Sequence, residues 1–298
     1  MTATRPRLTA VAAMGLGALA LSGCAVLGPA ADGTGSDTIA EKTTTVPLLN
    51  PDQLSVCADV PYPPFEFFEG NTLVGYDIDI AQRIADDLGV RLNVVDTSFE
   101  GIESGASLSG CDLNQSSISI TEERQRLMGF SLPYLDDDLV LVSGKDSGIT
   151  DIDSAQGKRV GVQAATTGEA YAEEQGLDTV QFEDGGMQLE SLKAGTVDAL
   201  LGNQSVILYG LKDDERFTVV DSFDTGESLG IGVSPENGLL LSAVNRTLTE
   251  MEEDGTFHEL RAKWFGEEAA DAHVTQAGTA AGSETDAETD SEIEEDGQ

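Results

Sequence analysis

Short apolar segments alternate with helical segments along two successive stretches of this chain, and this rhythm constrains the fold more than any other feature. Strands and helices that alternate at this spacing form parallel α/β layers. We therefore predict an α/β protein of two lobes, each a mostly parallel sheet flanked by helices. The predicted strands are 54–58, 91–95, 112–120, 158–162, 179–182 and 197–201, and the predicted helices are 75–89, 101–108, 166–174, 187–193, 206–211 and 240–252.

The segment 75–89 is predicted to be an amphipathic helix. Asp77 is placed to cap its start, and Gly89 can end it in a left-handed conformation. Helical spacing brings its apolar residues onto one face. That predicted face consists of Ile78, Ala81, Ile84, Ala85 and Leu88.

Two further apolar strands, 139–142 and 228–233, bracket the second stretch. We predict that they are hinge strands crossing between the lobes. The first lobe is then expected to comprise residues 52–141 and 231–266, and the second lobe residues 142–230.

The beginning of the chain, residues 1–23, is typical of an export signal. Arg5 and Arg7 precede an uncharged apolar run that is too short to span a bilayer comfortably. The run ends in Leu21-Ser22-Gly23-Cys24, which resembles a bacterial lipobox. In such a lipobox the sulfur of Cys24 carries a diacylglycerol with acyl chains such as palmitate, and the chain is cleaved before Cys24. We therefore expect an exported protein, lipid-anchored on the extracellular face of the cytoplasmic membrane. The alternatives are an ordinary signal peptide and a buried helix with a chance cysteine.

Two segments beside the body have no sustained apolar period. Residues 24–51 are rich in Ala, Gly, Thr, Ser and Pro, and are predicted to form a flexible tether. Residues 267–298 are small and acidic, and are predicted to be a disordered tail because they cannot bury enough apolar surface.

The formal net charge of −38 limits the partners of the protein. Nucleic-acid binding requires a basic face that meets phosphates, so no nucleic acid is expected. The acidity does not choose a ligand, because net charge governs solubility and association.

The three cysteines divide into two groups. Cys24 belongs to the predicted lipid anchor. Cys57 and Cys111 lie in or at the start of predicted strands, in a compartment where disulfides persist. We favour a Cys57–Cys111 disulfide, with two buried free thiols as the alternative.

The segment 116–124 is the strongest candidate for a binding site. It reads Ser-Ser-Ile-Ser-Ile-Thr-Glu-Glu-Arg, a strand that passes into the first turn of a helix with one arginine at that turn. Backbone N–H groups, hydroxyls and a guanidinium together bind carboxylates. From this segment alone, a solvated helix start with a surface arginine is the alternative.

From residue 54 to residue 266 the chain resembles bacterial extracellular solute-binding proteins of family 3, the polar amino acid type that serves ABC importers. Each motif alone is weak, but their order is specific. The motifs are Pro64-Phe65-Glu66-Phe67, Gly75-Tyr76-Asp77-Ile78-Asp79, Ile120-Thr121-Glu122-Glu123-Arg124, Phe130-Ser131-Leu132-Pro133-Tyr134, Gly195-Thr196-Val197-Asp198-Ala199, and Gly255-Thr256 with Trp264-Phe265.

This resemblance implies a type II periplasmic-binding-protein clamshell that closes on its ligand and delivers it to a membrane permease and its ATPase. It implies a monomeric binding protein rather than an enzyme, with no cofactor and no metal.

The resemblance also implies which residues hold a small zwitterionic amino acid. Arg124 matches the arginine that grips the ligand carboxylate, with Ser117 and Ser119 beside it. Thr166 and Thr167 open a helix of the second lobe and would donate to the same carboxylate.

Four other positions match residues around the rest of the ligand. Tyr62 and Phe99 match aromatic residues that sandwich the aliphatic part, although ordinary core aromatics are the alternative. Asp59 matches a polar residue that ends the first strand, and Gln163 could face the ligand side chain. Ala165 stands where the family usually has glycine, so backbone approach to the ligand is expected to be slightly less close.

Asn203 is a departure from the family pattern, which usually has an aspartate here that pairs with the ligand's α-ammonium. Three accounts remain open. Asp59 or Glu66 supplies the charge, the ligand nitrogen is substituted as in a betaine-like or cyclic compatible solute, or an ordinary amino acid binds more weakly.

Rival functions are a dehydratase-type enzyme on the same fold, a binding protein for a compatible solute, and a sensory receptor. The two histidines, His258 and His273, lie in a predicted terminal helix at 257–265 and in the tail, so neither is placed to act in the cleft. The acidic run 136–138 lacks the spacing of a calcium loop and is predicted to be solvated surface.

Overall fold

The computed structural model describes residues 46–271. The predicted export signal, Cys24 and the greater part of the predicted tether and tail lie outside the described residues. Among the residues described, no helix has the length and apolar character needed to cross a membrane.

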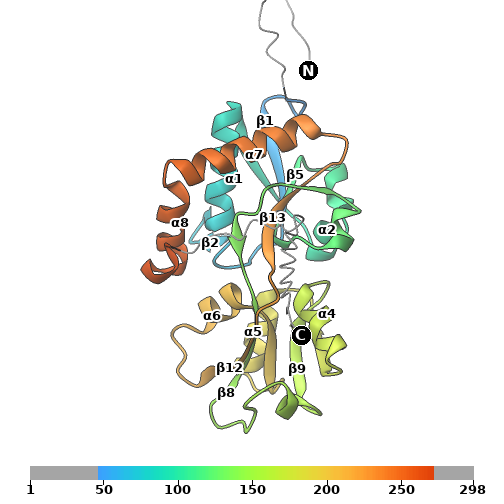
Figure 1. Ribbon diagram of the computed structural model, residues 1–298, viewed down its shortest axis with the longest axis vertical. Helices are drawn as coiled ribbons and strands as arrows, with labels where there is room; N and C mark the ends of the chain where they lie inside the picture. The colour runs from blue at the N-terminus through green and yellow to red at the C-terminus, as the bar shows by residue number, and fades with distance from the viewer. Residues whose placement is uncertain (1–45, 272–298) are drawn as a thin grey trace, which may run out of the picture. The chain divides into compact units, whose positions relative to one another are not determined.

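The first lobe is built on a mixed six-stranded sheet (Figure 1). β1 pairs in parallel with β4 and β5, whereas β13 runs antiparallel to β5, so the predicted mostly parallel arrangement holds for only part of it. In order, its strands are β4 (Arg91–Asp96), β1 (Gln53–Ala58), β5 (Leu113–Ser119), β13 (Ser228–Val233) and β6 (Gly129–Phe130), with β7 (Leu135–Asp136) paired to β13.

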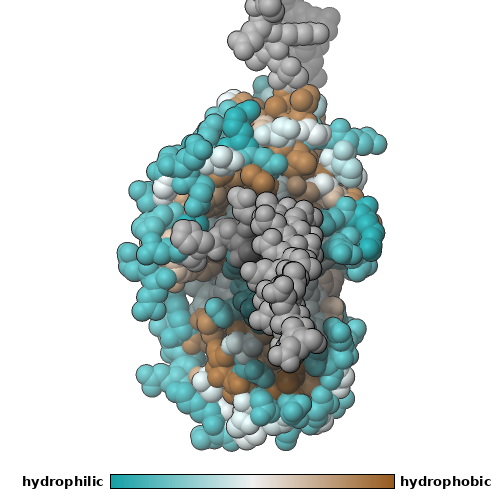
Figure 2. All heavy atoms as spheres, viewed as in Figure 1, coloured by the Kyte–Doolittle hydropathy of each residue, from teal (hydrophilic) through white to brown (hydrophobic). Residues whose placement is uncertain are grey.

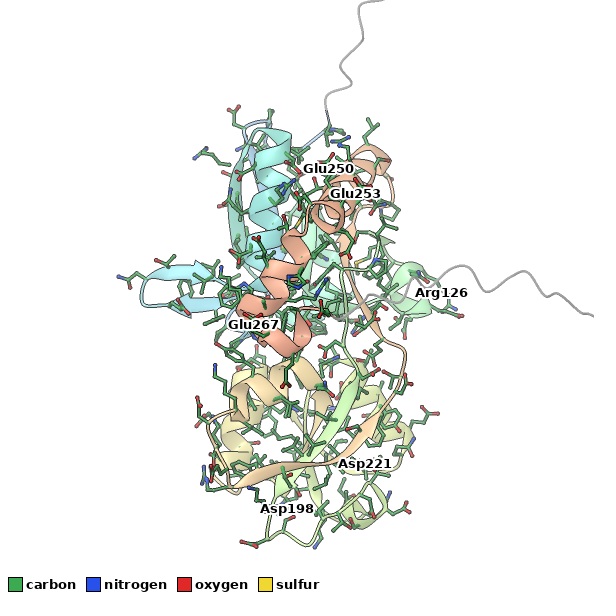
Figure 3. All side chains as sticks on the ribbon, turned by 60° about the vertical axis from the view of Figure 1, so that its left-hand side comes forward. Arg126, Asp198, Asp221, Glu250, Glu253 and Glu267 are labelled. Carbon is green, nitrogen blue, oxygen red and sulfur yellow. A yellow bond between two sulfur atoms is a disulfide. The ribbon has the colours of Figure 1, made fainter. Side chains whose placement is uncertain are left out.

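Helices α1, α7 and α8 pack together beside this sheet, and α2 lies at its other side (Figure 1). A separate hairpin, β2 (Phe67–Glu69) with β3 (Thr72–Val74), projects from the lobe (Figure 3). The helices of this lobe are α1 (Tyr76–Leu88), α2 (Phe99–Glu103), α3 (Glu122–Gln125), α7 (Gly238–Glu253) and α8 (Thr256–Phe265), with short 3-10 turns η1 (Ala106–Ser109) and η3 (Glu267–Ala269).

The second lobe is built on a five-stranded sheet that is buried on both faces. Along β8, Leu139 and Leu141 pack into one apolar cluster, and Val140 and Val142 into another on the opposite face. An unbroken apolar run is what a strand covered on both sides requires. The strands, in order, are β10 (Asp178–Phe182), β9 (Arg159–Gln163), β11 (Ala199–Asn203), β8 (Leu139–Gly144) and β12 (Phe217–Phe223), and the helices are η2 (Asp153–Ala155), α4 (Thr167–Glu174), α5 (Gly185–Lys193) and α6 (Gln204–Leu211).

The chain crosses between the two sheets at 137–138 and 224–227, just before the strands that we predicted as hinges. β8 pairs wholly within the second sheet and β13 wholly within the first. Residues 139–141 therefore belong with the second sheet and residues 228–230 with the first, which differs from the expected lobe boundaries. The two crossings contact each other, because the backbone N–H of Asp137 donates to the carbonyl of Glu227 (3.1 Å).

Both predicted flexible ends begin further from the body than we expected. Val46 and Leu48 pack against the core of the first lobe, and the N–H of Leu49 donates to Asp112 (2.7 Å). At the other end Ala270 is buried, and its carbonyl accepts a hydrogen bond from Nε of Arg261 (3.1 Å). Apolar contacts and hydrogen bonds thus order residues 46–51 and 267–271.

The helix predicted at 75–89 forms as α1, but Asp77 does not cap it. Gly75 precedes the helix, and Asp77 lies buried in its first turn. Gly89 ends the helix in the left-handed conformation, as expected. Ile80 takes a buried position, whereas Ile78 is half-buried, so the apolar face is rotated relative to the prediction.

Hydrophilic residues predominate along the margins of the face drawn in Figure 2, and hydrophobic residues form smaller patches between them.

Candidate functional site

Arg124 is the cation at the junction of the two lobes. The hydroxyl of Thr121 accepts its backbone N–H (3.2 Å) and so begins the short helix α3. The guanidinium is buried, with Nη1 donating to the Ser119 carbonyl (3.1 Å) and Nη2 to the Ala165 carbonyl (2.9 Å). Those carbonyls come from different lobes. Each terminal nitrogen keeps one further N–H, which is the fork that a carboxylate accepts in a bidentate manner.

Two neighbouring side chains, Phe99 and Glu103, interact with the positive charge of this guanidinium. Its carbon lies 5.4 Å from the centre of the Phe99 ring, a cation–π distance. Its Nε is 3.7 Å from a carboxylate oxygen of Glu103. Burial lowers the pKa of Arg124, and Glu103 and then Glu227 oppose that effect. Arginine nevertheless stays protonated, so the site carries a buried positive charge.

Ser117 and Ser119 lie on β5 beside Arg124 but play unequal parts. Ser117 adopts a left-handed backbone (φ 49°) where the pairing of β5 with β13 is irregular. Its N–H donates to Asp77 (2.8 Å), and its buried hydroxyl has no partner among the described residues. The backbone N–H of Ser117 is therefore already used by a contact within the first lobe. Ser119 is the serine that contacts Arg124, through its carbonyl.

Thr166 and Thr167 stand at the start of α4, as the sequence indicated. Thr166 caps the helix, because its hydroxyl accepts the N–H of Glu169 (3.2 Å). The Thr167 hydroxyl donates to Glu227 (2.7 Å). Ala165, just before the helix, is held with φ 63°, a conformation that costs a non-glycine residue energy. The first N–H groups of a helix have no acceptor within it, so those at the start of α4 are available to an anion.

Tyr62, Gln163, Thr166 and Asn203 line one small cavity between the lobes. Tyr62 packs across the gap onto the start of α5. A Cβ at Gly185 would lie 2.8 Å from the Tyr62 ring, so only glycine permits this approach. The structure thus brings together residues that the sequence separates by more than a hundred positions.

Asp59 and Gln163 form a second contact across the lobes. Nε2 of Gln163 donates to the Asp59 carboxylate (3.1 Å). Burial, and then the nearby carboxylates of Asp184 and Asp96, raise the pKa of Asp59 to about 7. A cation placed here would relieve that crowding of negative charge.

Asn203 ends β11, and its side chain faces the first crossing. Its Nδ2 donates to the backbone carbonyl of Asp137 (3.1 Å). The Asp137 carboxylate accepts from both the N–H (3.0 Å) and the hydroxyl (2.5 Å) of Ser205 at the start of α6. Burial raises the pKa of Asp137 to about 7. The prediction that residues 136–138 are solvated surface is therefore wrong for Asp137.

Glu66 and Asp77 are buried beneath the site without a cationic partner among the described residues. Ser116 hydrogen-bonds Glu66, and the Tyr134 hydroxyl donates to Asp77 (3.1 Å). Burial, and then Asp77, raise the pKa of Glu66 well above its usual value, while burial raises that of Asp77 to about 7. Two buried carboxyls cannot both be ionised at low cost, so this pair is held at least partly protonated at neutral pH.

The first lobe is also fastened covalently. Cys57 and Cys111 form a disulfide (S–S 2.10 Å) that ties β1 to the turn before β5. Asp59 directly follows β1 and Ser119 ends β5, so the bond ties together the two strands that position these site residues.

Sequence reasoning missed three carboxylates around this site: Glu103, Asp137 and Glu227. Glu103 lies on the helix that begins with Phe99. Asp137 and Glu227 lie in the two crossings, where the residues that contact them come from distant parts of the sequence. For Asp137 and Glu227 the available signal was their position next to a predicted hinge strand; Glu103 had no such signal.

The fold agrees with comparisons to known proteins. Residues 54–267 match the family model of bacterial extracellular solute-binding proteins, family 3. The chain belongs to this family.

Relatives and solved structures support the same assignment. The L-cystine-binding protein TcyJ of Escherichia coli is 31% identical over 212 residues, covering 69% of this chain and 79% of the relative. An ancestral arginine-binding protein solved with arginine is 34% identical with TM-score 0.67, covering 72% of this chain and 99% of that one. The ancestral amino acid-binding protein AncCDT-1, described as a precursor of cyclohexadienyl dehydratase, is 31% identical with TM-score 0.65, covering 72% and 95%.

Proposed function

We propose that this protein captures a free amino acid outside the cytoplasmic membrane and delivers it to the permease and ATPase of an ABC importer. The ligand lies between the lobes, with its carboxylate on Arg124 and its aliphatic part near Tyr62 and Phe99. Family membership and relatives that bind cystine and arginine support this function.

One observation carries the proposal: the Arg124 guanidinium is buried between the lobes and keeps two N–H groups uncommitted. Glu103 lies 3.7 Å from its Nε, but the two terminal nitrogens donate only to backbone carbonyls and can still meet an anion. A carboxylate that accepts these N–H groups and also the N–H groups at the start of α4 would join the first lobe to the second. Ligand binding and lobe closure would then be one event.

The proposal includes lipid anchoring at Cys24 and a monomeric state. The lipobox-like segment supports the anchor. Anchoring of the N-terminus would keep the protein close to its permease. Mass spectrometry of the membrane fraction would reveal acylation, and Cys24→Ala would release the protein into the medium if the anchor is correct.

A dehydratase is the second candidate, because AncCDT-1 is described as a precursor of such an enzyme. Asp59 has the raised pKa that a general acid uses. However, Asp59 is hydrogen-bonded to Gln163, and the family consists of binding proteins. Turnover of an aromatic hydroxy acid by the purified protein would favour the enzyme.

A thermal-shift screen of L-amino acids and compatible solutes tests the main proposal, because a ligand of the native state raises the unfolding midpoint. Arg124→Ala should weaken binding of the best ligand about 100-fold or more, since it removes a buried charge partner. Arg126→Ala is the matched control, because Arg126 is exposed at the edge of the first lobe (Figure 3). Equal binding by Arg124→Ala and Arg126→Ala would reject the proposed site.

A further inference from the structure

Two buried carboxyls, those of Glu66 and Asp77, lie beneath the strand that carries the candidate site, and the proposed capture of a ligand does not use them. We propose that Glu66 and Asp77 share one proton and are positioning residues for the carboxylate site, so that binding of the ligand and retention of this proton are coupled. This inference rests on the proposed function and deepens it, because it names a proton that the protein takes up when the ligand binds.

Backbone contacts hold the two carboxyls side by side. The N–H of Asp77 donates to the carbonyl of Phe65 (3.0 Å), the residue just before Glu66. A Cβ at Gly75 would overlap the same carbonyl oxygen, so only glycine lets the two segments approach so closely. The negative charge of Asp77 acts on Glu66, as expected of neighbouring carboxyls.

Hydrogen bonding leaves one oxygen of each carboxyl without a partner. Oδ2 of Asp77 accepts the N–H of Ser117 (2.8 Å) and the hydroxyl of Tyr134 (3.1 Å). Oε1 of Glu66 accepts the hydroxyl of Ser116. Oδ1 of Asp77 and Oε2 of Glu66 are buried and have no hydrogen-bond partner among the described residues. One proton held between these two oxygens would satisfy both and would reduce two buried charges to one.

The surroundings of the pair provide no cation that could replace the proton. Arg261 of α8 acts on Tyr76 and donates to the carbonyl of Ala270, and Lys263 is bonded to Asp79. The titratable groups that face the pair from other elements are acids and phenols. They are Asp59 after β1, Tyr62 in the turn before β2, Tyr76 on α1 and Tyr134 before β7.

Burial has the corresponding effect on proton affinity. It raises the pKa of Asp77 to about 7 and, together with the charge of Asp77, raises that of Glu66 well above its usual value. Asp77 has more donors than Glu66, and donors favour the ionised form. Glu66 is therefore the acid of the pair, and Asp77 is the carboxylate.

The carboxylate of Asp77 holds an unusual part of β5. Ser117 adopts a positive φ of 49°, which costs a residue with a side chain energy, and its N–H is bound by Asp77. Two residues further along, the carbonyl of Ser119 accepts a hydrogen bond from Arg124 (3.1 Å). The backbone that supports the guanidinium is thus anchored on Asp77.

Glu66 reaches the other strand of the same wall. The Ser116 hydroxyl that donates to Glu66 also accepts the backbone N–H of Asp59 (3.1 Å), just after β1. The two carboxyls together therefore position the ends of β1 and β5 that meet at the site.

This arrangement links the proton to the ligand. Loss of the proton would leave two adjacent buried anions, whose repulsion is relieved when the carboxyls separate and release Ser116 and Ser117. A ligand on Arg124 would hold β5 in place and so keep the carboxyls together with their proton. Because linkage is reciprocal, the complex should retain the proton to higher pH than the free protein. Affinity is then complete at lower pH and falls as pH rises through the ionisation of the pair.

The test counts protons by calorimetric titration in two buffers of different ionisation enthalpy, from pH 7 to pH 10. The probe is L-arginine, which a structural relative binds, or, if the wild type does not bind it, the L-amino acid with the largest thermal shift. Glu66→Gln and Asp77→Asn each replace the shared proton by an amide N–H that cannot leave. Glu69→Gln, exposed on the projecting hairpin, is the matched control (Figure 3).

We expect the wild type and Glu69→Gln to take up a proton on binding that Glu66→Gln and Asp77→Asn do not take up. The two amide variants should bind as tightly as the wild type at pH 7. At pH 10 they should bind roughly tenfold more tightly, the effect of a one-unit rise in the pKa of the pair on binding. Titration of the probe itself is the same for every variant and cancels in the comparison.

Infrared difference spectra observe the proton directly. The wild type should show the carbonyl band of a buried protonated carboxylic acid at pH 8, and Glu66→Gln should lack that band. The unfolding midpoint of each variant verifies its fold, and if one amide variant does not fold, the other carries the comparison.

Equal proton uptake by the wild type and Glu66→Gln, or the absence of the carboxylic acid band, would overturn the inference and leave the proposed function intact. Loss of binding by folded Glu66→Gln at pH 7 would also overturn it, because the site would then require a charge on Glu66. If the wild type binds no amino acid, the proposed function fails and the inference with it.

Discussion

The two walls of the cleft contribute different chemistry. The first lobe supplies ionisable groups, Arg124 and Asp59, on strands fastened by a disulfide and underlain by the buried carboxyls of Glu66 and Asp77. The second lobe supplies neutral groups: the Gln163 amide, the Ala165 carbonyl and the hydroxyls of the α4 start. The difference indicates that the first lobe attracts the ligand by charge, and that the second lobe completes the hydrogen bonding on closure.

The largest expected effect is a dependence of stability on pH that originates in the first lobe and the crossings. Asp77, Asp59 and Asp137 have folded pKa values raised from 3.8 to about 7. Below pH 4 each carboxyl is protonated in both states. Between pH 4 and pH 7 the unfolded chain loses the proton first, so stability falls as pH rises and levels off above pH 7.

Asp137 alone would remove up to about 4 kcal/mol over that range, because its shift is about three pH units. Denaturant unfolding at pH 5 and pH 8 measures the sum. Hydrogen exchange at the two pH values should show β1 and β5 loosening before β9 and β10. Greater stability at pH 8, or equal loosening of both sheets, would contradict the proposed difference between the two lobes.

Removal of the disulfide should be the next largest effect. Cys57→Ser with Cys111→Ser opens a loop with a sequence separation of 54 residues. We expect the free energy of unfolding to fall by about 2–4 kcal/mol. Ligand affinity should fall too, because β1 and β5 carry the charged wall. An unchanged unfolding midpoint under denaturant would mean that packing alone holds the two strands.

A hydroxyl of the second lobe should matter less than the charge of the first. Thr167→Val keeps the shape of the side chain but removes the hydroxyl that positions Glu227. We expect ligand affinity to fall about tenfold, less than for Arg124→Ala, because a neutral donor is lost. Thr249→Val on exposed α7 is the control. A loss as large as that of Arg124→Ala would mean that the second lobe carries as much binding energy as the first.

The smallest expected effect concerns the strained turn before α4. Ala165→Gly should stabilise the protein by about 0.5–1 kcal/mol, because relief of the positive φ exceeds the entropy that glycine adds to the unfolded chain. Ala164→Gly, without a positive φ, should destabilise it. Chemical denaturation of the two variants measures both, and destabilisation by Ala165→Gly would show that the strain estimate has the wrong sign.

The sequence was sufficient for features that depend on local pattern. The strand ending in serines and the arginine at the following turn appear as β5 and α3 because apolar alternation and the Thr121 cap are encoded within nine residues. The two-lobed α/β architecture followed from repeated strand–helix alternation and from ordered family motifs.

Features set by distant partners could not be read in this way. Asp77 looked like a helix cap, yet its carboxylate is bound by Ser117 and Tyr134, 40 and 57 residues away. Asp137 looked like surface, yet Ser205 satisfies it from 68 residues away. Glu227 acquires its place only when both crossings and α4 meet. Burial of a carboxyl depends on donors that fold against it, and local hydrophilicity does not reveal them.

The most direct test compares the tightest-binding L-amino acid with its own carboxamide by calorimetric titration, in the wild type and in Arg124→Ala. If Arg124 grips the carboxylate, the carboxamide should bind the wild type about 100-fold more weakly, and Arg124→Ala should bind both forms equally weakly. Equal affinity of the wild type for the acid and the amide would contradict a carboxylate site at Arg124.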